Sequence, residues 1–341
     1  GDALARVGHG VFQFAPEHSR LPVAEWPWMR DLARRTGRPV CVNLNQPDQD
    51  PDVWRTVLQL LDDAAAEGLP IYAQVAGRSI GILYCLHGSV HPLLFHPAYA
   101  EVQHLPMRER LAALAEPERR RRIVEEVPDD GSFFQRVVLD KLTRTWPVEG
   151  TDIDYEPSAD TSVAAVAATR GVPPMQVVLD HLTAQEGHGM LYAPFFNYAY
   201  GDLTQHPRTR MGLSDAGAHC GAICDGGMPT FMLTHWTRDR RRGPRLPLEY
   251  VVHRQTRQTA ELYGLDDRGL VAPGWRADLN LIDDDALGFD VPRMAFDLPA
   301  GGRRLVQRGC GYVATFVAGV QTVADDEFTG ALPGRLVRGP Q

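Results

Sequence analysis

The stretch from Met211 to His219, which reads MGLSDAGAH, is the part of the sequence best suited to chemistry. Its apolar start ends at Ser214 and Asp215, and small residues follow. This pattern predicts a buried strand that ends in a carboxylate, with glycine allowing a ligand or backbone to approach closely. In α/β folds, catalytic groups lie at such strand ends. We therefore expect Asp215 to be the catalytic carboxylate of a hydrolase. A turn in which Asp215 caps a helix is the alternative.

The composition argues against several classes of protein. The 341 residues are 44% hydrophobic and 23% charged, which is typical of a globular chain with a sizeable core. A net charge of −8 argues against a nucleic-acid partner and against an anionic membrane. No apolar run approaches the roughly 18 residues of a membrane span. The five scattered cysteines form no disulfide framework, so we expect a reducing compartment, the cytoplasm.

Alternating apolar segments predict a parallel sheet with crossover helices. The strands are expected over residues 11–14, 40–44, 70–75 and 211–213, and helices over 26–36 and 51–68 separate the first three. Strand and helix alternating at this spacing is typical of βαβ units. We therefore expect an α/β fold in which the motif around Asp215 closes the last of these strands.

Four polar residues lie near the ends of the predicted strands: Gln13, Asn43, Gln74 and Arg78. They are expected to converge at one mouth and to contact a substrate. Arg78 suits a substrate carboxylate because its planar guanidinium donates two parallel hydrogen bonds. An ordinary surface ion pair is an equally common use of one arginine. For Asn43 and Gln74 the alternative is that each satisfies buried backbone groups.

The rest of the chain offers weaker signals. Residues 79–150 have irregular periodicity and are expected to form an insertion that serves as a lid or pocket wall. The aromatic run over 195–200 suits an apolar acyl group, although core packing explains it more simply. Two sets of metal-ligand types lack a metal-site spacing, and we interpret both as ordinary side chains. They are His87, His91, His96 and His104, and His219 with Cys220 and Cys224.

Three segments together resemble the C-terminal part of metal-dependent amidohydrolases of the N-acyl-D-amino-acid deacylase type. The first is the strand end from Ser214 to His219, and the second is GLVAPGWRADL from Gly269 to Leu279. The third is GALPGR, which begins at Gly330. The second segment is the most specific, because Pro-Gly followed by Ala-Asp-Leu marks the strand that returns to the family's small β-sandwich.

The resemblance implies an α/β fold: the C-terminal half of a (β/α)8 TIM-type barrel over residues 1–264, with the C-terminal part of a small β-sandwich over 265–341. It also implies that a metal-bound water hydrolyses an amide, that of an N-acyl amino acid. Asp215 would then take a proton from the water, pass it to the leaving amine and contact the metal. His219 is expected to contact the substrate. The cofactor would be Zn²⁺, with most ligands in an N-terminal region that the chain does not contain.

The departures from the family pattern are equally informative. The family's histidines from its fifth and sixth strands are missing, and Gln13 and Asn43 stand near those positions, although amides are poor ligands for transition metals. A truncated or non-catalytic relative without the metal site is therefore the main alternative. A carbohydrate-active barrel is a further one, and it needs a second acid such as Asp225 or Glu17.

The number of barrel-type strands indicates a fragment of a longer protein, because only four are found and a closed barrel needs eight. The two open sheet edges would leave apolar surface exposed. We therefore expect the 341 residues alone to be poorly soluble or to associate, into a homo-oligomer for example, and to lack deacylase activity.

Overall fold

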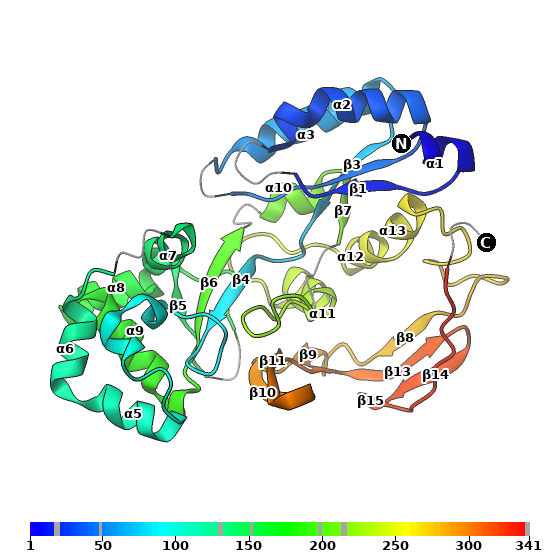
Figure 1. Cartoon of the computed structure of the whole chain (residues 1–341). Helices are drawn as coiled ribbons and strands as arrows, with labels where there is room; N and C mark the ends of the chain where they lie inside the picture. Colours follow the sequence, from blue (N-terminus) through cyan, green and yellow to red (C-terminus); the bar gives the residue numbers. More distant parts are fainter. Residues whose placement is uncertain are drawn as a thin grey trace.

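The main sheet has four parallel strands in the order β1-β2-β3-β7. The computed structural model describes residues 1–16, 21–47, 50–128, 132–150, 153–196, 200–212 and 217–337. The strands are β1 (Phe12–Phe14), β2 (Val40–Asn43), β3 (Ile71–Val75) and β7 (Thr209–Met211) (Figure 1). The first three agree with the sequence prediction. The fourth begins two residues earlier than the predicted 211–213.

Helices α2 (Leu21–Thr36) and α3 (Val53–Ala66) cover one face of this sheet (Figure 1). The apolar stripe of α3, which includes Trp54, Val57 and Leu61, is buried in one core with the sheet residues that point toward it. Burial of each such side chain contributes about 1.5–3 kcal/mol. The sheet and its helices are therefore held together by the 3.6-residue and two-residue apolar periods visible in the sequence.

The part of the sequence between β3 and β7 forms a second, antiparallel sheet with the order β4-β6-β5. Its strands are β4 (Ile80–Tyr84), β5 (Trp146–Pro147) and β6 (Leu191–Phe196). Helices surround it: α4 (Pro97–Ala100), α5 (Met107–Ala115), α6 (Pro117–Glu125), α7 (Phe133–Leu139), α8 (Val163–Arg170) and α9 (Pro174–Thr183). Short 3-10 turns are η1 (Pro92–Phe95), η2 (Asp140–Arg144), η3 (Ala159–Thr161) and η4 (Gln185–Gly187). Together they enclose a separate apolar core.

One helix precedes β7 in the sequence and several follow it. The last two together occupy a stretch that the sequence predicts to be one helix. In chain order these elements are α10 (Tyr200–Gln205), α11 (Met228–Thr234), a π-helical turn η5 (His235–Asp239), α12 (Leu248–Gln255) and α13 (Arg257–Leu262). A single helix is predicted over 248–263, and this prediction is wrong at Thr256. Its φ of −114° and ψ of −90° leave the helical region, which separates α12 from α13.

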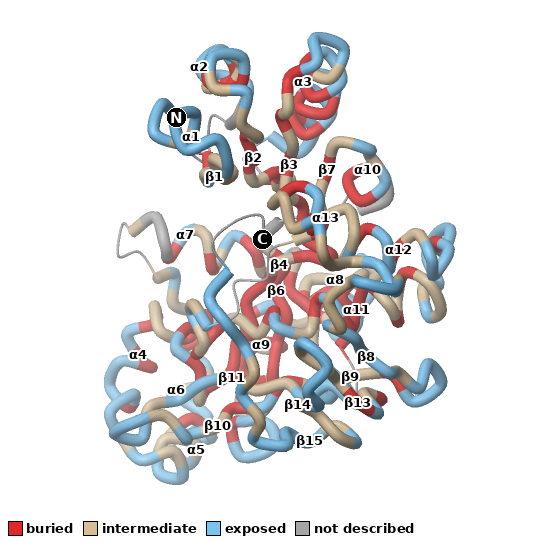
Figure 2. The backbone as a smooth tube through the Cα atoms, turned by 90° about the vertical axis from the view of Figure 1, so that its right-hand side faces the viewer, coloured by how far each residue is buried: buried red, intermediate tan, exposed pale blue. Residues whose placement is uncertain are grey.

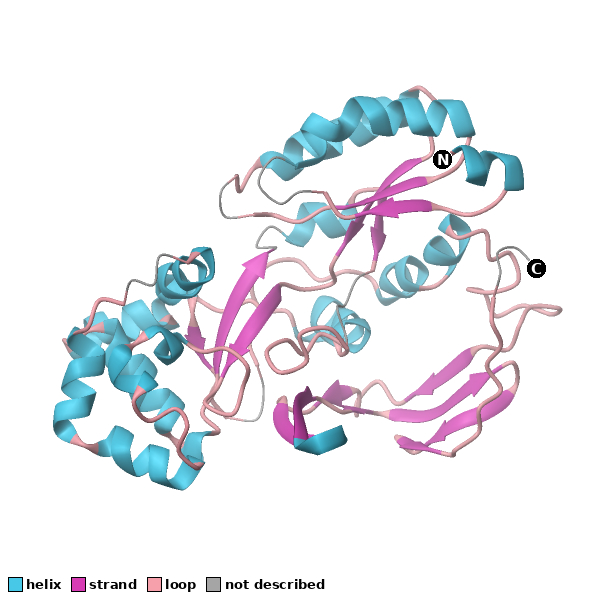
Figure 3. Ribbon diagram, viewed as in Figure 1, coloured by secondary structure: helices cyan, strands magenta, loops and turns pink. Residues whose placement is uncertain are grey.

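The C-terminal strands form small antiparallel sheets (Figure 3). One contains β8 (Leu279–Ile282), β13 (Tyr312–Val317), β14 (Val320–Ala324) and β15 (Glu327–Phe328). β10 (Arg293–Leu298) pairs with β11 (Gly302–Val306) around the turn η6 (Pro299–Gly301), and β9 (Gly288–Phe289) pairs with β12 (Gly309–Cys310). The strand predicted over 270–273 is a loop. The small α1 (Asp2–Val7) precedes the main sheet.

Many residues of the C-terminal sheet are exposed (Figure 2), and several of them are apolar. Leu281 is 57% exposed and Phe328 is 85% exposed. Within the described part of the chain, β1 and β7 each pair on one side only. No helix in that part is long and apolar enough to cross a membrane. Open strand edges together with exposed apolar residues favour association.

We expect the 341-residue chain to self-associate at micromolar concentrations. Leu281→Ser reduces an exposed apolar contact on the C-terminal sheet, so it should lower the average mass measured by size-exclusion chromatography with light scattering. Val127→Ser is the matched control, because Val127 is exposed but lies far from that sheet in the chain. A monodisperse monomer before any substitution would contradict this expectation.

His91 is a buried histidine just before η1. Its side chain is 1% exposed, and Nε2 lies 3.2 Å from the hydroxyl of Tyr99. Burial, together with smaller contributions from the nearby Arg110 and Arg303, lowers the pKa of His91 to about 3. The folded state therefore holds this ring neutral over a pH range in which an unfolded histidine is charged.

Acid should destabilise the chain through His91. Because its folded pKa lies below the ordinary 6.5, the unfolded state binds more protons between about pH 6.5 and pH 3. Each pH unit in that window removes up to about 1.4 kcal/mol. Urea unfolding at pH 7 and pH 4 should show a smaller loss of stability for His91→Gln than for the unmodified chain. An identical loss of stability in both proteins would show that protonation of His91 does not cause the acid destabilisation.

Candidate active site

The face of the main sheet that points away from α2 and α3 is polar. Strand register places Gln13, Cys41, Asn43 and Gln74 on this face, opposite α2 and α3. Gln13 Nε2 donates to Gln74 Oε1 at 2.6 Å, and Asn43 is the direct neighbour of Gln74 in the register. Asn43 Oδ1 is buried without a hydrogen-bond partner within the described residues. Three of the residues predicted to line a mouth therefore lie together.

Gly212, directly after β7, lies close against the side chain of Gln74. A Cβ at this position would lie 2.4 Å from Gln74 Nε2, far inside van der Waals contact. The glycine thus lets the chain leave the strand against the polar face. Asp215, the predicted catalytic and metal-binding carboxylate, follows within residues 213–216, which lie outside the described residues.

Arg78 is placed differently from the other predicted substrate contacts. Its side chain is 2% exposed and forms an ion pair of 3.0 Å with Asp225, which is equally buried. The guanidinium also donates to the carbonyls of Cys224 at 2.9 Å and Ser79 at 3.1 Å, and it lies 3.8 Å from the ring centre of Tyr155. Burial alone would lower the pKa of Arg78, but Tyr155 and Asp225 raise it above its ordinary value. In this arrangement the guanidinium is engaged inside the protein.

The loop that follows the central motif is held by backbone hydrogen bonds from two sides. Leu83 N, on β4, donates to Ala222 O at 2.8 Å, and Leu305 N, on β11, donates to Cys220 O at 2.6 Å. His219 begins the loop with a φ of 50°, and its carbonyl accepts from the amides of Ala222 and Ile223. The imidazole of His219 is exposed, and among the described residues it forms no hydrogen bond or ion pair.

Asp225 and Tyr155 are the functional-site neighbours that the substrate prediction missed. Asp225 was considered only as the second acid of a carbohydrate-active barrel, and here its carboxylate serves Arg78. Glu17, the other acid considered for that role, lies outside the described residues. Tyr155 carries no local signal, because its contact with Arg78 joins segments far apart in the sequence.

Metal-ligand side chains do not cluster in the described part of the chain. No group of three His, Cys, Asp or Glu residues there is arranged to hold an ion. Burial raises the pKa of Cys224 to about 11, so this thiol is protonated at neutral pH. The polar face itself presents the amides of Gln13, Asn43 and Gln74, which are poor ligands for zinc.

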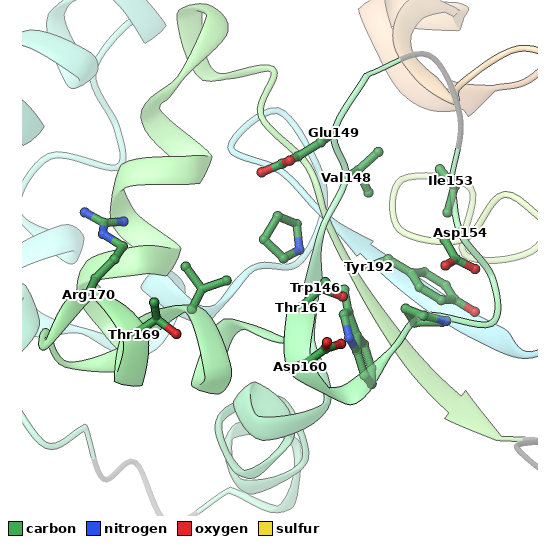
Figure 4. A pocket seen from close by; sticks show the side chains of 13 residues that line it. Trp146, Val148, Glu149, Ile153, Asp154, Asp160, Thr161, Thr169, Arg170 and Tyr192 are labelled. Carbon is green, nitrogen blue, oxygen red and sulfur yellow. The ribbon is translucent and has the colours of Figure 1, made fainter.

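A cavity of about 490 Å³ lies beside β5 and α8, away from the predicted site residues (Figure 4). Trp146 and Tyr192 contribute aromatic walls, and Thr169 and Arg170 face them from α8. Arg170 is already paired with Asp180 at 2.7 Å. None of the residues predicted to bind substrate lines this cavity.

Removing one partner of the buried ion pair should destabilise the folded state strongly. We expect Arg78→Met to lower the free energy of unfolding by about 3–5 kcal/mol, because Asp225 then stays buried without its counter-charge. The double variant Arg78→Met, Asp225→Leu should lose less than the sum of the single variants. Urea denaturation measures all three.

Arg304→Met is the matched control for that experiment. Arg304 forms an exposed ion pair with Asp297 at 2.8 Å, so its loss should cost only about 0–1 kcal/mol. Equal costs for Arg78→Met and Arg304→Met would contradict the importance assigned to the buried pair.

Known proteins are similar to this chain over most of its length. The sequence profile of the amidohydrolase family matches residues 12–323. An uncharacterized protein of Mycobacterium tuberculosis is 27% identical over 300 residues, which are 80% of this chain and 49% of that protein. An adenine deaminase of Desulfatibacillum aliphaticivorans is 49% identical over 53 residues, which are 16% of this chain and 8% of the deaminase. The chain spans about half the length of the first of these relatives.

Structural comparison agrees with the family profile. The crystal structure of a D-aminoacylase, described as defining a novel subset of amidohydrolases, matches with a TM-score of 0.52 at 20% identity. The match covers 96% of this chain and 56% of that one. It identifies the fold as a TIM-barrel-like α/β fold. Because the family profile extends over nearly the whole chain, this protein belongs to the amidohydrolase family.

Proposed function

We propose that the chain is part of a hydrolase that cleaves the amide bond of an N-acyl amino acid, with Asp215 as general base and acid. One observation carries the proposal. Asn43 and Gln74 lie together near the carboxyl ends of parallel strands, and Asp215 follows the carboxyl end of the adjacent parallel strand β7 by four residues. Catalytic groups of barrel enzymes are mounted at this end of the sheet.

The proposed reaction needs one proton carrier. Asp215 accepts a proton from water while the water oxygen attacks the acyl carbon. It then donates that proton to the amide nitrogen as the C–N bond breaks, which yields a carboxylic acid and a free amine and restores the carboxylate. Asn43 and Gln74 each offer an N–H donor and a carbonyl acceptor, so they suit orientation of the substrate amide.

The side chains of the described residues do not form a site that fits the metal of the family. Those residues hold no group of three potential ligands, and the amides near the strand ends bind transition metals poorly. The proposed proton transfers by Asp215 therefore involve no metal. In the proposal, Asp215 is the contribution of this chain to a zinc site whose other ligands lie outside the described residues. His219 and Arg78 remain proposed substrate contacts, and for Arg78 this would require exchange of Asp225 for a substrate carboxylate.

The proposal also includes the finer fold. The four parallel strands would be the later half of a (β/α)8 barrel, and the C-terminal sheets would be part of a small β-sandwich. Two facts support this. β1 and β7 are open on one side within the described residues, and the D-aminoacylase chain is matched over 56% of its length.

Asp215→Asn tests the proposed role. The substitution should be made in the native gene product that contains these residues, with release of free amine from N-acetyl-D-methionine and N-acetyl-L-methionine as the measurement. Loss of general acid and base catalysis should lower kcat by about 10²–10⁴-fold. Asp160→Asn, at an exposed position, is the control and should leave kcat unchanged. An Asp215→Asn variant as active as the control would refute the assignment.

A non-catalytic relative is the second candidate, and the lack of a ligand group among the described residues favours it. The two candidates differ in metal content. The hydrolase should retain about one zinc or more per chain after dialysis, as measured by mass spectrometry, and should release amine from at least one N-acyl amino acid. A gene product that neither retains metal nor hydrolyses any member of an N-acyl amino acid panel supports the non-catalytic relative.

A further inference from the structure

A second cavity, of about 300 Å³, opens where three parts of the chain meet. Its walls come from residues 153–156, from the end of α11 with the turn η5, and from β9. The lining residues are Ile153, Asp154, Tyr155, Glu156, Phe231, Thr234, His235, Asp239, Arg241, Arg242 and Phe289. Its size is at the lower end of small-molecule sites, which span roughly 300–1,000 Å³.

Aromatic rings form the apolar part of this cavity. The ring of Phe231 lies 5.5 Å from that of Tyr155 and 6.4 Å from that of Phe289, measured between centroids. The imidazole of His235 stacks on Phe231 at 4.4 Å with an interplanar angle of 15°. Tyr155 and Phe231 are buried, and Tyr155 is further fixed by the guanidinium of Arg78. These rings contact one another, and Phe289 is the partly exposed member, so a flat ligand would pack on Phe289 at the edge of the cluster in an offset or edge-to-face arrangement.

Each carboxylate that lines the cavity is already neutralised by a neighbouring base. Glu156 accepts from Arg240 at 2.7 Å and lies 3.0 Å from His235 Nε2. Burial alone would raise the pKa of Glu156, but the hydrogen bonds from His235 and Arg240 lower it to about 2. The other two acids are also paired, Asp154 with Arg242 at 2.6 Å and Asp239 with Arg238 at 2.8 Å.

Arg241 is the lining cation left over from these pairs. Among the described residues it forms no hydrogen bond or ion pair, and its side chain is exposed at the cavity rim. With Arg238, Arg240 and Arg242 paired to the three acids of the lining, Arg241 is left as a cation beside the aromatic wall. A guanidinium that is free to donate two parallel hydrogen bonds matches a carboxylate.

The backbone next to Arg241 is also unusual. Residues His235–Asp239 form a π-helical turn, a rare conformation that is frequent at functional sites. Trp236 Nε1 donates to the carbonyl of Gly77 at 2.8 Å and so fixes the turn to the end of β3. The same turn contributes His235 and Asp239 to the cavity.

We propose that this cavity binds a small aromatic carboxylate, with the ring packed against Phe289 at the edge of the cluster that Phe289 forms with Phe231 and Tyr155, and the carboxylate on Arg241. This site shares a boundary with the proposed hydrolytic site at Tyr155, which contacts Arg78, but Arg241 and Phe289 have no part in amide hydrolysis, so variants of these two residues test it independently of the proposed function. The ligand needs both parts, because the aromatic wall alone does not select charge and Arg241 alone does not select shape.

Three probes separate these contributions: benzoate, benzylamine and acetate. Benzoate should bind the 341-residue chain saturably in ligand-observed saturation-transfer NMR. Benzylamine has the same ring with the opposite charge, and acetate has the carboxylate without the ring, so both should bind at least about tenfold more weakly. Equal binding of benzylamine would overturn the role of the charge, and equal binding of acetate would overturn the role of the ring.

Arg241→Gln should weaken benzoate binding about five- to tenfold, because one charge-assisted contact is lost. Arg6→Gln, which removes an exposed arginine from α1, is the control and should leave binding unchanged. Circular dichroism checks that both variants keep the fold. Phe289→Ala should weaken benzoate and leave the weak binding of acetate unaltered. Benzoate binding that is equally strong in Arg241→Gln, or undetectable in the unmodified chain, would overturn the proposal.

Discussion

The buried ion pair between Arg78 and Asp225 is the interaction on which the arrangement of the chain depends. Placing two charges at 2% exposure costs several kcal/mol per ion, so the pair persists only where other contacts offset that cost. Here the guanidinium also donates to two backbone carbonyls and lies on the ring of Tyr155. Because these partners come from three separate segments, the charge holds together the chain after β3, the segment of Tyr155 and the loop after the central motif.

One face of the main sheet packs against helices, and the other carries the candidate site residues. One face is apolar and is fixed by α2 and α3, so its strands keep a defined register. On the other face the same register brings Gln13, Asn43 and Gln74 together, and the hydrogen bond between Gln13 and Gln74 orients two of the three amides. Gly212 lets the chain leave β7 against this polar surface without a clash. The positions of the candidate site residues thus follow from packing on the opposite face.

Sequence periodicity predicted the elements that have one apolar face. The first three parallel strands and the helices α2 and α3 alternate or repeat clearly, and all five were identified, although α2 begins at Leu21, five residues before its predicted start. β4 was missed because Gly81–Tyr84 is buried throughout, so it shows no alternation. The break at Thr256 was missed because neither proline nor glycine marks it. Periodicity fails where burial is two-sided or where tertiary contacts bend a helix.

The candidate site was predictable to the extent that it follows strand register. Gln13, Asn43 and Gln74 were expected to converge because they lie near neighbouring strand ends, and they do. The environment of Arg78 was not predictable, because its partner Cys224 is 146 residues away and no local pattern connects them. The same holds for the cavity at Arg241, whose walls come from three segments. Long-range pairings of charges and rings are decided by the fold, and the sequence alone does not reveal them.

The polar face also constrains what chemistry the described residues can perform. Its amides are neither protonated nor deprotonated near neutral pH, so they can orient a substrate but cannot act as base or acid. Cys41 lies on the same face, but burial raises its pKa to about 12, which keeps the thiol protonated and unreactive. A cysteine nucleophile is therefore disfavoured on this surface. In the proposed reaction, proton transfer falls to a carboxylate beyond β7, and Asp215 is the residue in the central motif that supplies one.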